Sequence, residues 1–219
     1  RTFYYPNWAE SFYRPLPATN IQGVGFPEGF KVIFAGNLGE AQSLETIVAA
    51  AGRLKGKAAD IHWIMVGYGR RCDWMQQQVQ RLGLERQVHF PGRFPAAAMP
   101  EFFAHADALL VTLKSDDVFA QTIPSKVQSY MACAKPVLAA LNGEGARVIE
   151  EAAGIAVAAE NDHALAEAVL ELYHMPAEQR LAMGNRGRDY YNRCFERNML
   201  VKKLEQWMVE VKEEGLCES

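Results

Sequence analysis

The chain of 219 residues is 49% hydrophobic and 22% charged and has a formal net charge of −3, values typical of a soluble globular protein with room for one large or two small domains. The small negative charge excludes a global basic field of the kind that attracts nucleic acid, and no apolar run approaches the roughly 20 residues that cross a bilayer.

After a lead-in of residues 1–30, short apolar segments alternate with segments of helical periodicity. The pattern predicts strands at 31–36, 61–67, 87–92, 108–113, 136–141 and 154–159. It predicts helices at 43–56, 73–82, 99–105 and 125–134, and helix throughout 162 to about 214. Because apolar strands joined by helices form right-handed βαβ units, the expected fold is α/β, a Rossmann-like doubly wound parallel sheet covered by helices on both faces.

The same pattern divides the chain into a lead-in (1–30), an α/β unit (31–195) and a terminal helical segment (196–219). In the last part, four apolar residues recur at helical spacing and form one face of the predicted helix: Leu200, Leu204, Trp207 and Val211. We expect this apolar face to pack against another surface. The sequence opens on Arg1 rather than on methionine, so we expect a piece of a longer protein.

Two glycine turns follow the first two predicted strands, and in doubly wound sheets ligands bind at the carboxyl ends of the strands. The first turn runs from Gly36 to Gly39, and the second contains Gly67 and Gly69. Glycines let backbone N–H groups approach an anion closely, and the start of the following helix favours negative charge. An ordinary tight turn between strand and helix remains the alternative for both.

The next two loops carry side chains of other kinds. Arg93 and Phe94 follow the third strand, where they could hold a flat base, or Phe94 could belong to the core. The loop 114–126 is the longest between elements, and long ordered loops are often functional. Its Asp116, Asp117 and Gln121 are groups of the kind that bind sugar hydroxyls, although a solvated loop has the same composition.

Lys126 stands in the first turn of a helix predicted to start at Ser125, where Ser125 and Gln128 match a capping box. A cation is unfavourable there, because the helix start already carries roughly half a positive charge. A diphosphate held between Gly36–Gly39 and Ser125–Lys126 would be stabilised by the lysine and by the helix dipole together. The alternative is a surface lysine that extends into water.

Taken together and in this order, these segments resemble the donor-binding, carboxy-terminal domain of family-4 retaining glycosyltransferases, which have the two-domain GT-B fold. The matching segments cover residues 31–172 and include "FAGNLGEAQSLETIVAAAGRL", "IMVGYG", "VHFPGRF", "MPEFFAHADALLVTL" and "PSKVQSYMACAKPVLA". The lead-in resembles the linker between the two domains of this family, and the last helix resembles the one that packs back toward the amino-terminal domain. The "GNLG" and "PSK" patterns are similar to those of the branch that builds bacterial surface polysaccharides such as O-antigen and capsule.

The resemblance implies a role for each matching residue. Gly36, Asn37, Leu38, Gly39, Ser125 and Lys126 would bind the donor diphosphate. Gly67, Tyr68, Arg93, Phe94 and Ser129 would bind the base and ribose. Asp116, Asp117, Phe119 and Gln121 would face the donor sugar, with Lys126 and Gln121 as the catalytic residues.

The implied activity is transfer, with retention, of a hexosyl or N-acetylhexosaminyl group from a nucleotide sugar (UDP favoured) to a lipid-linked saccharide. Such enzymes need neither metal nor cofactor. The location would be the cytoplasm, peripheral to the inner face of the bacterial inner membrane. We expect this chain alone to turn over poorly without the amino-terminal acceptor domain. The four cysteines (Cys72, Cys133, Cys194, Cys217) form no CxxC or Cys/His cluster, which predicts free thiols and no metal site.

Two departures from the family pattern keep alternatives open. Many members carry two glutamates where this chain has Gln121 and Ser129, and an arginine and a lysine where it has Asn37 and Gln42. Loss of the glutamates favours a second hypothesis, a nucleotide-sugar-binding subunit without catalysis. A third, an NAD-dependent oxidoreductase, lacks support, because the first turn has no three-glycine fingerprint and Gly67 stands where a ribose-binding acid is expected.

Overall fold

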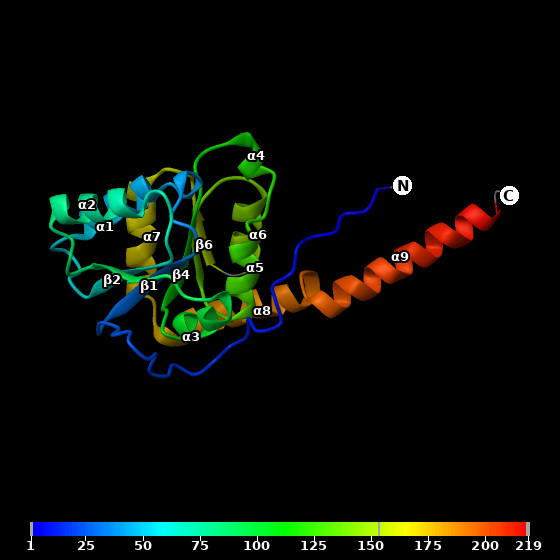
Figure 1. Cartoon of the computed structure of the whole chain (residues 1–219), viewed down its shortest axis with the longest axis horizontal. Coiled ribbons are helices and arrows are strands. Elements are labelled where there is room, and N and C mark those ends of the chain that lie inside the picture. Colours follow the sequence, from blue (N-terminus) through cyan, green and yellow to red (C-terminus); the bar gives the residue numbers. More distant parts are fainter. Residues whose placement is uncertain (1, 153, 218–219) are drawn as a thin grey trace.

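Six parallel strands form one sheet in the computed structural model, which describes residues 2–152 and 154–217 (Figure 1). The strands are β1 (Phe30–Ala35), β2 (Ile61–Val66), β3 (Val88–Gly92), β4 (Ala108–Thr112), β5 (Val137–Ala140) and β6 (Gly154–Val157). Their order across the sheet is β3-β2-β1-β4-β5-β6, and all neighbours pair in parallel. This is the order of a doubly wound nucleotide-binding sheet, which confirms the predicted fold class.

Helices cover both faces of the sheet and leave one terminal helix projecting (Figure 1). The α-helices are α1 (Leu44–Leu54), α2 (Cys72–Leu82), α3 (Met99–Ala104), α4 (Asp117–Ala120), α5 (Ser125–Ala132), α6 (Glu144–Ala152), α7 (Asp162–His174), α8 (Ala177–Cys194) and α9 (Arg197–Cys217). Short 3-10 turns, η1 (Glu40–Gln42) and η2 (Ala96–Ala98), precede α1 and α3.

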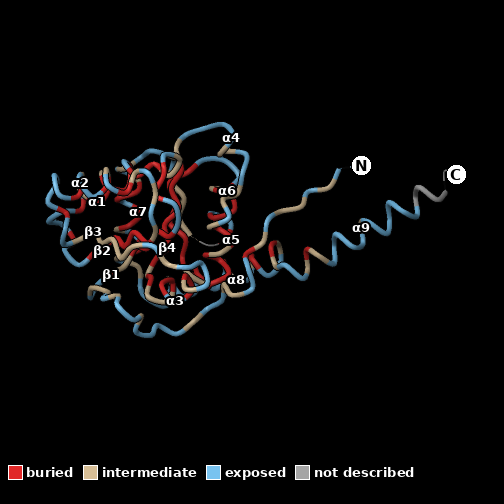
Figure 2. Tube along the Cα trace, in the orientation of Figure 1, coloured by how far each residue is buried: buried red, intermediate tan, exposed pale blue. Residues whose placement is uncertain are grey.

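The core consists of two apolar clusters, one on each face of the sheet. In β1, Val32 and Phe34 belong to the cluster with α1, α2 and α7, whereas Ile33 and Ala35 belong to the cluster with α3, α5 and α6. Because both faces of the strand are covered, these four positions are all buried. Figure 2 shows the buried residues concentrated in this layered body, while most of α9 is exposed.

Helix α6 lies between β5 and β6, where the sequence predicted no helix. Gly145 in its first turn weakens the helical pattern and is closely packed, so that a side chain there would force its neighbours to shift. A Cβ at Gly145 would lie 3.0 Å from Cδ1 of Leu141 and 3.1 Å from Cδ of Pro124. The predicted continuous helix from residue 162 is likewise divided into three, with Pro176 as the N-cap of α8.

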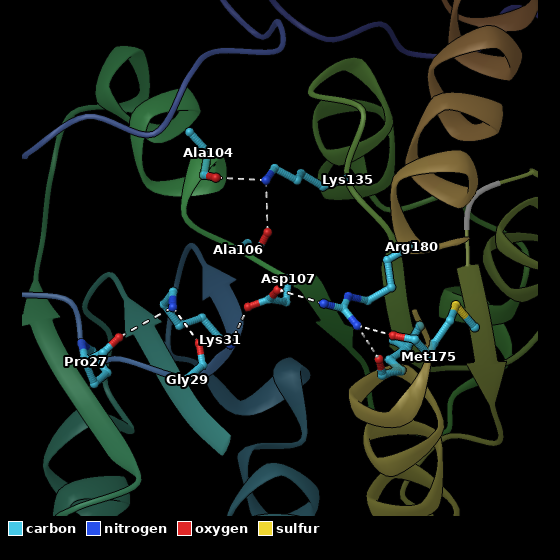
Figure 3. Close-up of polar contacts among 10 residues, drawn as sticks. Pro27, Gly29, Lys31, Ala104, Ala106, Asp107, Lys135, Met175 and Arg180 are labelled. Atoms are coloured by element: carbon cyan, nitrogen blue, oxygen red, sulfur yellow. Dashed lines mark hydrogen bonds and ion pairs between the residues drawn. The ribbon is translucent and has the colours of Figure 1, made fainter. Parts of the chain in front are cut away.

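A polar network joins the amino ends of β1 and β4 to the end of α3, to the loop before β5 and to the loop between α7 and α8 (Figure 3). The Asp107 carboxylate accepts a hydrogen bond from the Lys31 N–H (2.9 Å) and forms an ion pair with Arg180 (3.4 Å). The Arg180 guanidinium also donates to the carbonyl oxygen of Met175. Lys135 donates to the carbonyl oxygens of Ala104 (2.8 Å) and Ala106. These bonds hold the amino ends of the central strands in place, at the end of the sheet opposite the loops predicted to bind ligand.

Helix α9 extends away from the body, and the first residues of the chain lie on the same side of the molecule (Figure 1). Of the predicted apolar face, Leu200 is buried, and the Trp207 ring stacks on the Phe3 ring with centroids 4.5 Å apart. Leu204 and Val211 remain exposed. Within residues 2–152 and 154–217, no helix has both the length and the apolar character that crossing a membrane requires.

Candidate functional site

A cavity of about 670 Å³ opens at the carboxyl ends of β1, β2 and β3, beside the start of α5. This is the position that a doubly wound sheet gives to its ligand. The lining includes nine of the residues predicted for the site: Gly36, Asn37, Gly67, Tyr68, Arg93, Phe94, Ser125, Lys126 and Ser129. Residues from four separate loops and helices are therefore brought together as the sequence predicted.

The two glycine turns are in backbone contact. A Cβ at Gly67 would lie 1.9 Å from the carbonyl oxygen of Gly36, and a Cβ at Gly69 would lie 2.4 Å from that of Leu38. Gly36 and Gly67 have φ values of +137° and +139°, which residues with side chains rarely adopt. The glycines thus allow the turns after β1 and β2 to approach each other and form one wall of the cavity.

Leu38 was predicted to bind the donor diphosphate, and its backbone groups are hydrogen-bonded within the fold. Its side chain is fully buried, its N–H donates to the carbonyl oxygen of Tyr68 (3.1 Å), and its own carbonyl accepts from the N–H of Arg71 (3.0 Å). Gly39 lies outside the cavity lining. Leu38 therefore holds the turn in place. Asn37 lines the cavity, and within the described residues its N–H has no hydrogen-bond partner.

Helix α5 begins at Ser125, as predicted, but the predicted capping box is wrong. Pro124 occupies the N-cap position, and no side chain among the described residues caps this helix. Ser125 is instead the first helical residue, and the Ser129 hydroxyl donates back to its carbonyl oxygen (3.2 Å). The N–H groups at the positive end of the α5 dipole therefore receive no capping hydrogen bond from a described side chain.

The Lys126 side chain lies along the wall of the cavity and packs against the turn after β1. Its ammonium donates a hydrogen bond to Oε1 of Gln42 and lies 4.0 Å above the centroid of the Phe34 ring. A Cβ on Gly36 would come within 2.8 Å of its Cε atom. The alternative of a surface lysine is excluded by these contacts.

Burial lowers the pKa of Lys126 from its ordinary value to about 7, because no anion compensates the lost hydration of the ammonium. The charged side chains that line the cavity are Arg93 and Lys126, and no carboxylate is among the described residues of the lining. The cavity therefore favours an anion, and a bound anion would restore the full charge of Lys126.

The far part of the cavity is largely aromatic. Phe94 is half-buried and packs on Phe102 with ring centroids 4.6 Å apart, so it both joins the core cluster and lines the cavity. Sequence reasoning missed Tyr13, Met99, Phe103 and Tyr130, which complete this part of the lining. Tyr130 could have been found, because it lies four residues after Lys126 and therefore on the same face of α5.

The residues predicted to face the donor sugar do not line the cavity. Asp116 is the N-cap of α4, and its carboxylate accepts from the N–H groups of Val118 (2.8 Å) and Phe119 (3.3 Å). The Phe119 side chain packs against the α3–α5–α6 cluster. Asp117 and Gln121 are exposed at the two ends of α4. The structure thus gives Asp116 and Phe119 structural roles and separates Gln121 from the cavity.

No group of three or more His, Cys, Asp or Glu side chains that could hold a metal ion occurs in the part of the chain that the structure describes. Cys72, Cys133 and Cys194 are free thiols. The side chain of Cys217 lies outside the described part.

Comparison with known proteins gives the family. A family model for glycosyl transferases group 1 matches residues 19–190. The probable glycosyltransferase WbjE of Pseudomonas aeruginosa is 34% identical over 154 residues, which make up 66% of this chain and 37% of that protein. The putative colanic acid biosynthesis glycosyl transferase WcaI of Escherichia coli (strain K12) is 25% identical over 211 residues, 92% of this chain and 50% of that protein. The chain thus spans half or less of the length of these two relatives.

Solved structures show the same fold. HepE of Anabaena, in a complex with UDP-glucose, superposes with a TM-score of 0.70 at 20% identity and covers 83% of this chain and 49% of that one. The carboxy-terminal domain of LpcC from Francisella tularensis gives a TM-score of 0.62 at 18% identity, over 76% of this chain and 86% of that one. The sheet is therefore the Rossmann-like unit found in GT-B glycosyltransferases. Because the family model matches most of its length, the chain belongs to the glycosyl transferases of group 1.

Proposed function

We propose that this chain is the donor-binding half of a retaining glycosyltransferase that takes a sugar from a nucleoside-diphosphate sugar, with UDP as the favoured nucleotide. The observation that carries the proposal is Lys126, which stands in the first turn of α5 and lines a cavity that has no carboxylate among its described lining residues. Two relatives named as glycosyltransferases and a structural neighbour in a complex with UDP-glucose support the choice of ligand.

The donor diphosphate would lie between the turn after β1 and the start of α5. There the Asn37 N–H, the first turn of α5 and the Lys126 ammonium would surround its oxygens. As the bond to the sugar breaks, negative charge grows on the leaving diphosphate, and fixed donors at that point stabilise the transition state. Lys126 would supply the positive charge that a metal ion supplies in other transferases, so the reaction is proposed to need neither metal nor cofactor.

We further propose a lipid-linked saccharide as the acceptor and bacterial surface polysaccharide, such as O-antigen, capsule or lipopolysaccharide, as the product. The name of the relative WcaI, a putative colanic acid biosynthesis glycosyl transferase, supports this role. The transferred group would be a hexosyl or N-acetylhexosaminyl unit, and the enzyme would work in the cytoplasm at the inner face of the inner membrane. The acceptor half would pack against the exposed apolar side chains of α9, which include Leu204 and Met208. Without it, this chain is expected to bind donor but to turn over poorly.

A second candidate is a nucleotide-sugar-binding subunit without catalytic activity. It is favoured by Gln121, which replaces a family glutamate and stands outside the cavity lining. The two candidates share the donor site and differ in turnover. Release of nucleotide above background by the longer protein, supplied with donor and acceptor, would support the transferase. Donor binding without any release would support the binding subunit.

The donor site is tested by thermal unfolding of the chain in the presence of UDP, GDP, ADP, several nucleotide sugars and NAD. Stabilisation by one nucleoside diphosphate and its sugars, but not by NAD, is the expected result. Lys126→Met keeps the length of the side chain and removes its charge, and should weaken nucleotide binding by about 1.5–3 kcal/mol. Lys57→Met, at an exposed lysine outside the cavity lining, is the matched control. Equal affinity of both variants for nucleotide would refute the site.

A further inference from the structure

Tyr13 lines the cavity although it belongs to the lead-in and not to the α/β unit. We propose that the Tyr13 hydroxyl binds the ribose of the nucleotide together with Ser129. The segment 9–26, which we call the strap, would then contribute a ligand-binding residue to the donor site. This inference rests on the proposed function, and it assigns to the site a specificity-determining residue from outside its sheet.

The strap is held on both sides of Tyr13. Before it, Ala9 is buried, and its carbonyl oxygen accepts a hydrogen bond from the Tyr191 hydroxyl of α8 (3.4 Å). After it, the Thr19 carbonyl oxygen lies 2.8 Å from Nε2 of His105, at the end of α3, and the His105 ring stacks on Phe26 at 4.1 Å. Because the strap is anchored to two helices, Tyr13 has a defined position over the cavity.

Aromatic packing fixes the ring of Tyr13 as well. The ring lies nearly parallel to Phe103, with centroids 6.1 Å apart and planes inclined by 12°. Phe103 in turn packs edge-to-face on Tyr130 at 5.0 Å, and the Tyr130 hydroxyl accepts a hydrogen bond from the N–H of Ala35 at the end of β1 (3.1 Å). Three rings thus connect the strap to the end of the central strand. The Tyr13 hydroxyl has Ser129 as a hydrogen-bonding neighbour.

The position of Tyr13 matches the ribose and not the diphosphate. Ser129 stands one helical turn after Ser125 and Lys126, about 5 Å further along α5. The Ser129 side chain lies beside Tyr13: burial raises the pKa of Tyr13, and Ser129 opposes that rise as a hydrogen-bonding neighbour. The Tyr13 hydroxyl therefore stays protonated at neutral pH and can donate. A nucleotide with its phosphates at Lys126 and its sugar directed along α5 would place its ribose hydroxyls between these two side chains.

The test compares UDP with its 2′-deoxy and 3′-deoxy analogues and with inorganic pyrophosphate, by calorimetry on the whole chain. If the thermal panel selects another base, the corresponding analogues are used. Tyr13→Phe keeps the ring that packs on Phe103 and removes only the hydroxyl. Tyr4→Phe, at a tyrosine of the lead-in that is 71% exposed, is the matched control. Thermal unfolding of both variants checks that the strap and sheet remain intact.

We expect Tyr13→Phe to raise the Kd for UDP about five- to tenfold, with no change for pyrophosphate or in the control. For at least one deoxy analogue, Tyr13→Phe should leave the Kd unchanged, because the ribose hydroxyl that pairs with Tyr13 is already missing from that analogue. An unchanged Kd for UDP, or equal losses for UDP and pyrophosphate, overturns the inference. If the wild-type chain binds no nucleotide, the proposed function fails first and the inference with it. If the wild type binds and Lys126→Met weakens binding while Tyr13→Phe does not, only the inference fails.

Discussion

Donor binding should take up a proton, because the Lys126 pKa of about 7 in the empty cavity cannot persist beside a diphosphate. In the empty cavity at pH 8, about nine in ten Lys126 side chains are neutral, and at pH 6 about one in ten is. A bound diphosphate raises the pKa toward the ordinary value of 10.5. Binding should therefore take up about 0.9 proton at pH 8 and about 0.1 at pH 6.

The sign of the pH dependence follows from this difference. The pKa of Lys126 is higher in the complex than in the empty cavity, so affinity is greatest below pH 7 and falls as the pH rises. Between pH 8 and pH 9 the Kd should increase about tenfold. Burial raises the pKa values of Tyr13 and Tyr130 above their ordinary value, so these two hydroxyls do not titrate in this range.

The assay is calorimetry at pH 8 in buffers with different enthalpies of ionisation. The slope of the observed binding enthalpy against the ionisation enthalpy gives the number of protons taken up. A nucleotide sugar is the correct ligand, because its diphosphate is esterified at both ends, whereas a terminal phosphate titrates with a pKa of about 6. Lys126→Met is the control and should show a slope near zero and a Kd that is flat with pH. Tight binding by the wild type with no proton uptake at pH 8 would refute the assignment of Lys126 to the diphosphate.

Three further predictions concern stability. Without ligand, Lys126→Met should raise the free energy of unfolding by about 1–2 kcal/mol at pH 7. The gain should shrink toward pH 10, because between the folded-state and unfolded-state pKa values of Lys126 the unfolded wild type binds one more proton than the folded wild type. Thermal melts at both pH values check this, and an equal gain at both would contradict it. Gly67→Ala should cost about 3 kcal/mol in urea unfolding, because its Cβ would meet the Gly36 carbonyl oxygen at 1.9 Å; a loss below 1 kcal/mol would show that the turns can separate. Arg180→Ala should cost about 2–3 kcal/mol in the same assay, because Asp107 loses its ion-pair partner and the Met175 carbonyl loses its donor. Asp107→Asn should cost less, because the Lys31 N–H can still donate to the asparagine oxygen.

The sheet could be predicted because its strands are buried on both faces. In β1 and β2 every position is buried or nearly so, and such strands read as continuous apolar runs. Helix α6 was not predicted, although its buried residues Val148, Ile149 and Ala152 recur at helical spacing. Gly143 and Gly145 stand at its start, and by local rules glycines favour a loop.

The site shows the same division. Lys126 could be identified because a cation at a helix start violates a local rule, and such violations occur at functional sites. Asp116 was predicted to face the donor sugar, and the structure gives it a role that the prediction did not consider. Aspartate is a preferred N-cap residue, and Asp116 caps α4. Tyr13 gave no signal, because its place over the cavity depends on the strap, whose anchors on α3 and α8 are distant in sequence.

Gln42 indicates how the proposed donor site would hold a diphosphate with fewer cations than the family resemblance implies. It occupies the position of a family lysine, yet its amide oxygen accepts the hydrogen bond of the Lys126 ammonium. A lysine at position 42 would place a second cation against Lys126 in a buried site, and like charges disfavour each other's ionisation. Glutamine instead orients the one ammonium without neutralising it. The remaining positive potential comes from the start of α5 and from Arg93. We therefore expect the affinity of this chain for a diphosphate donor to depend on the charge state of Lys126.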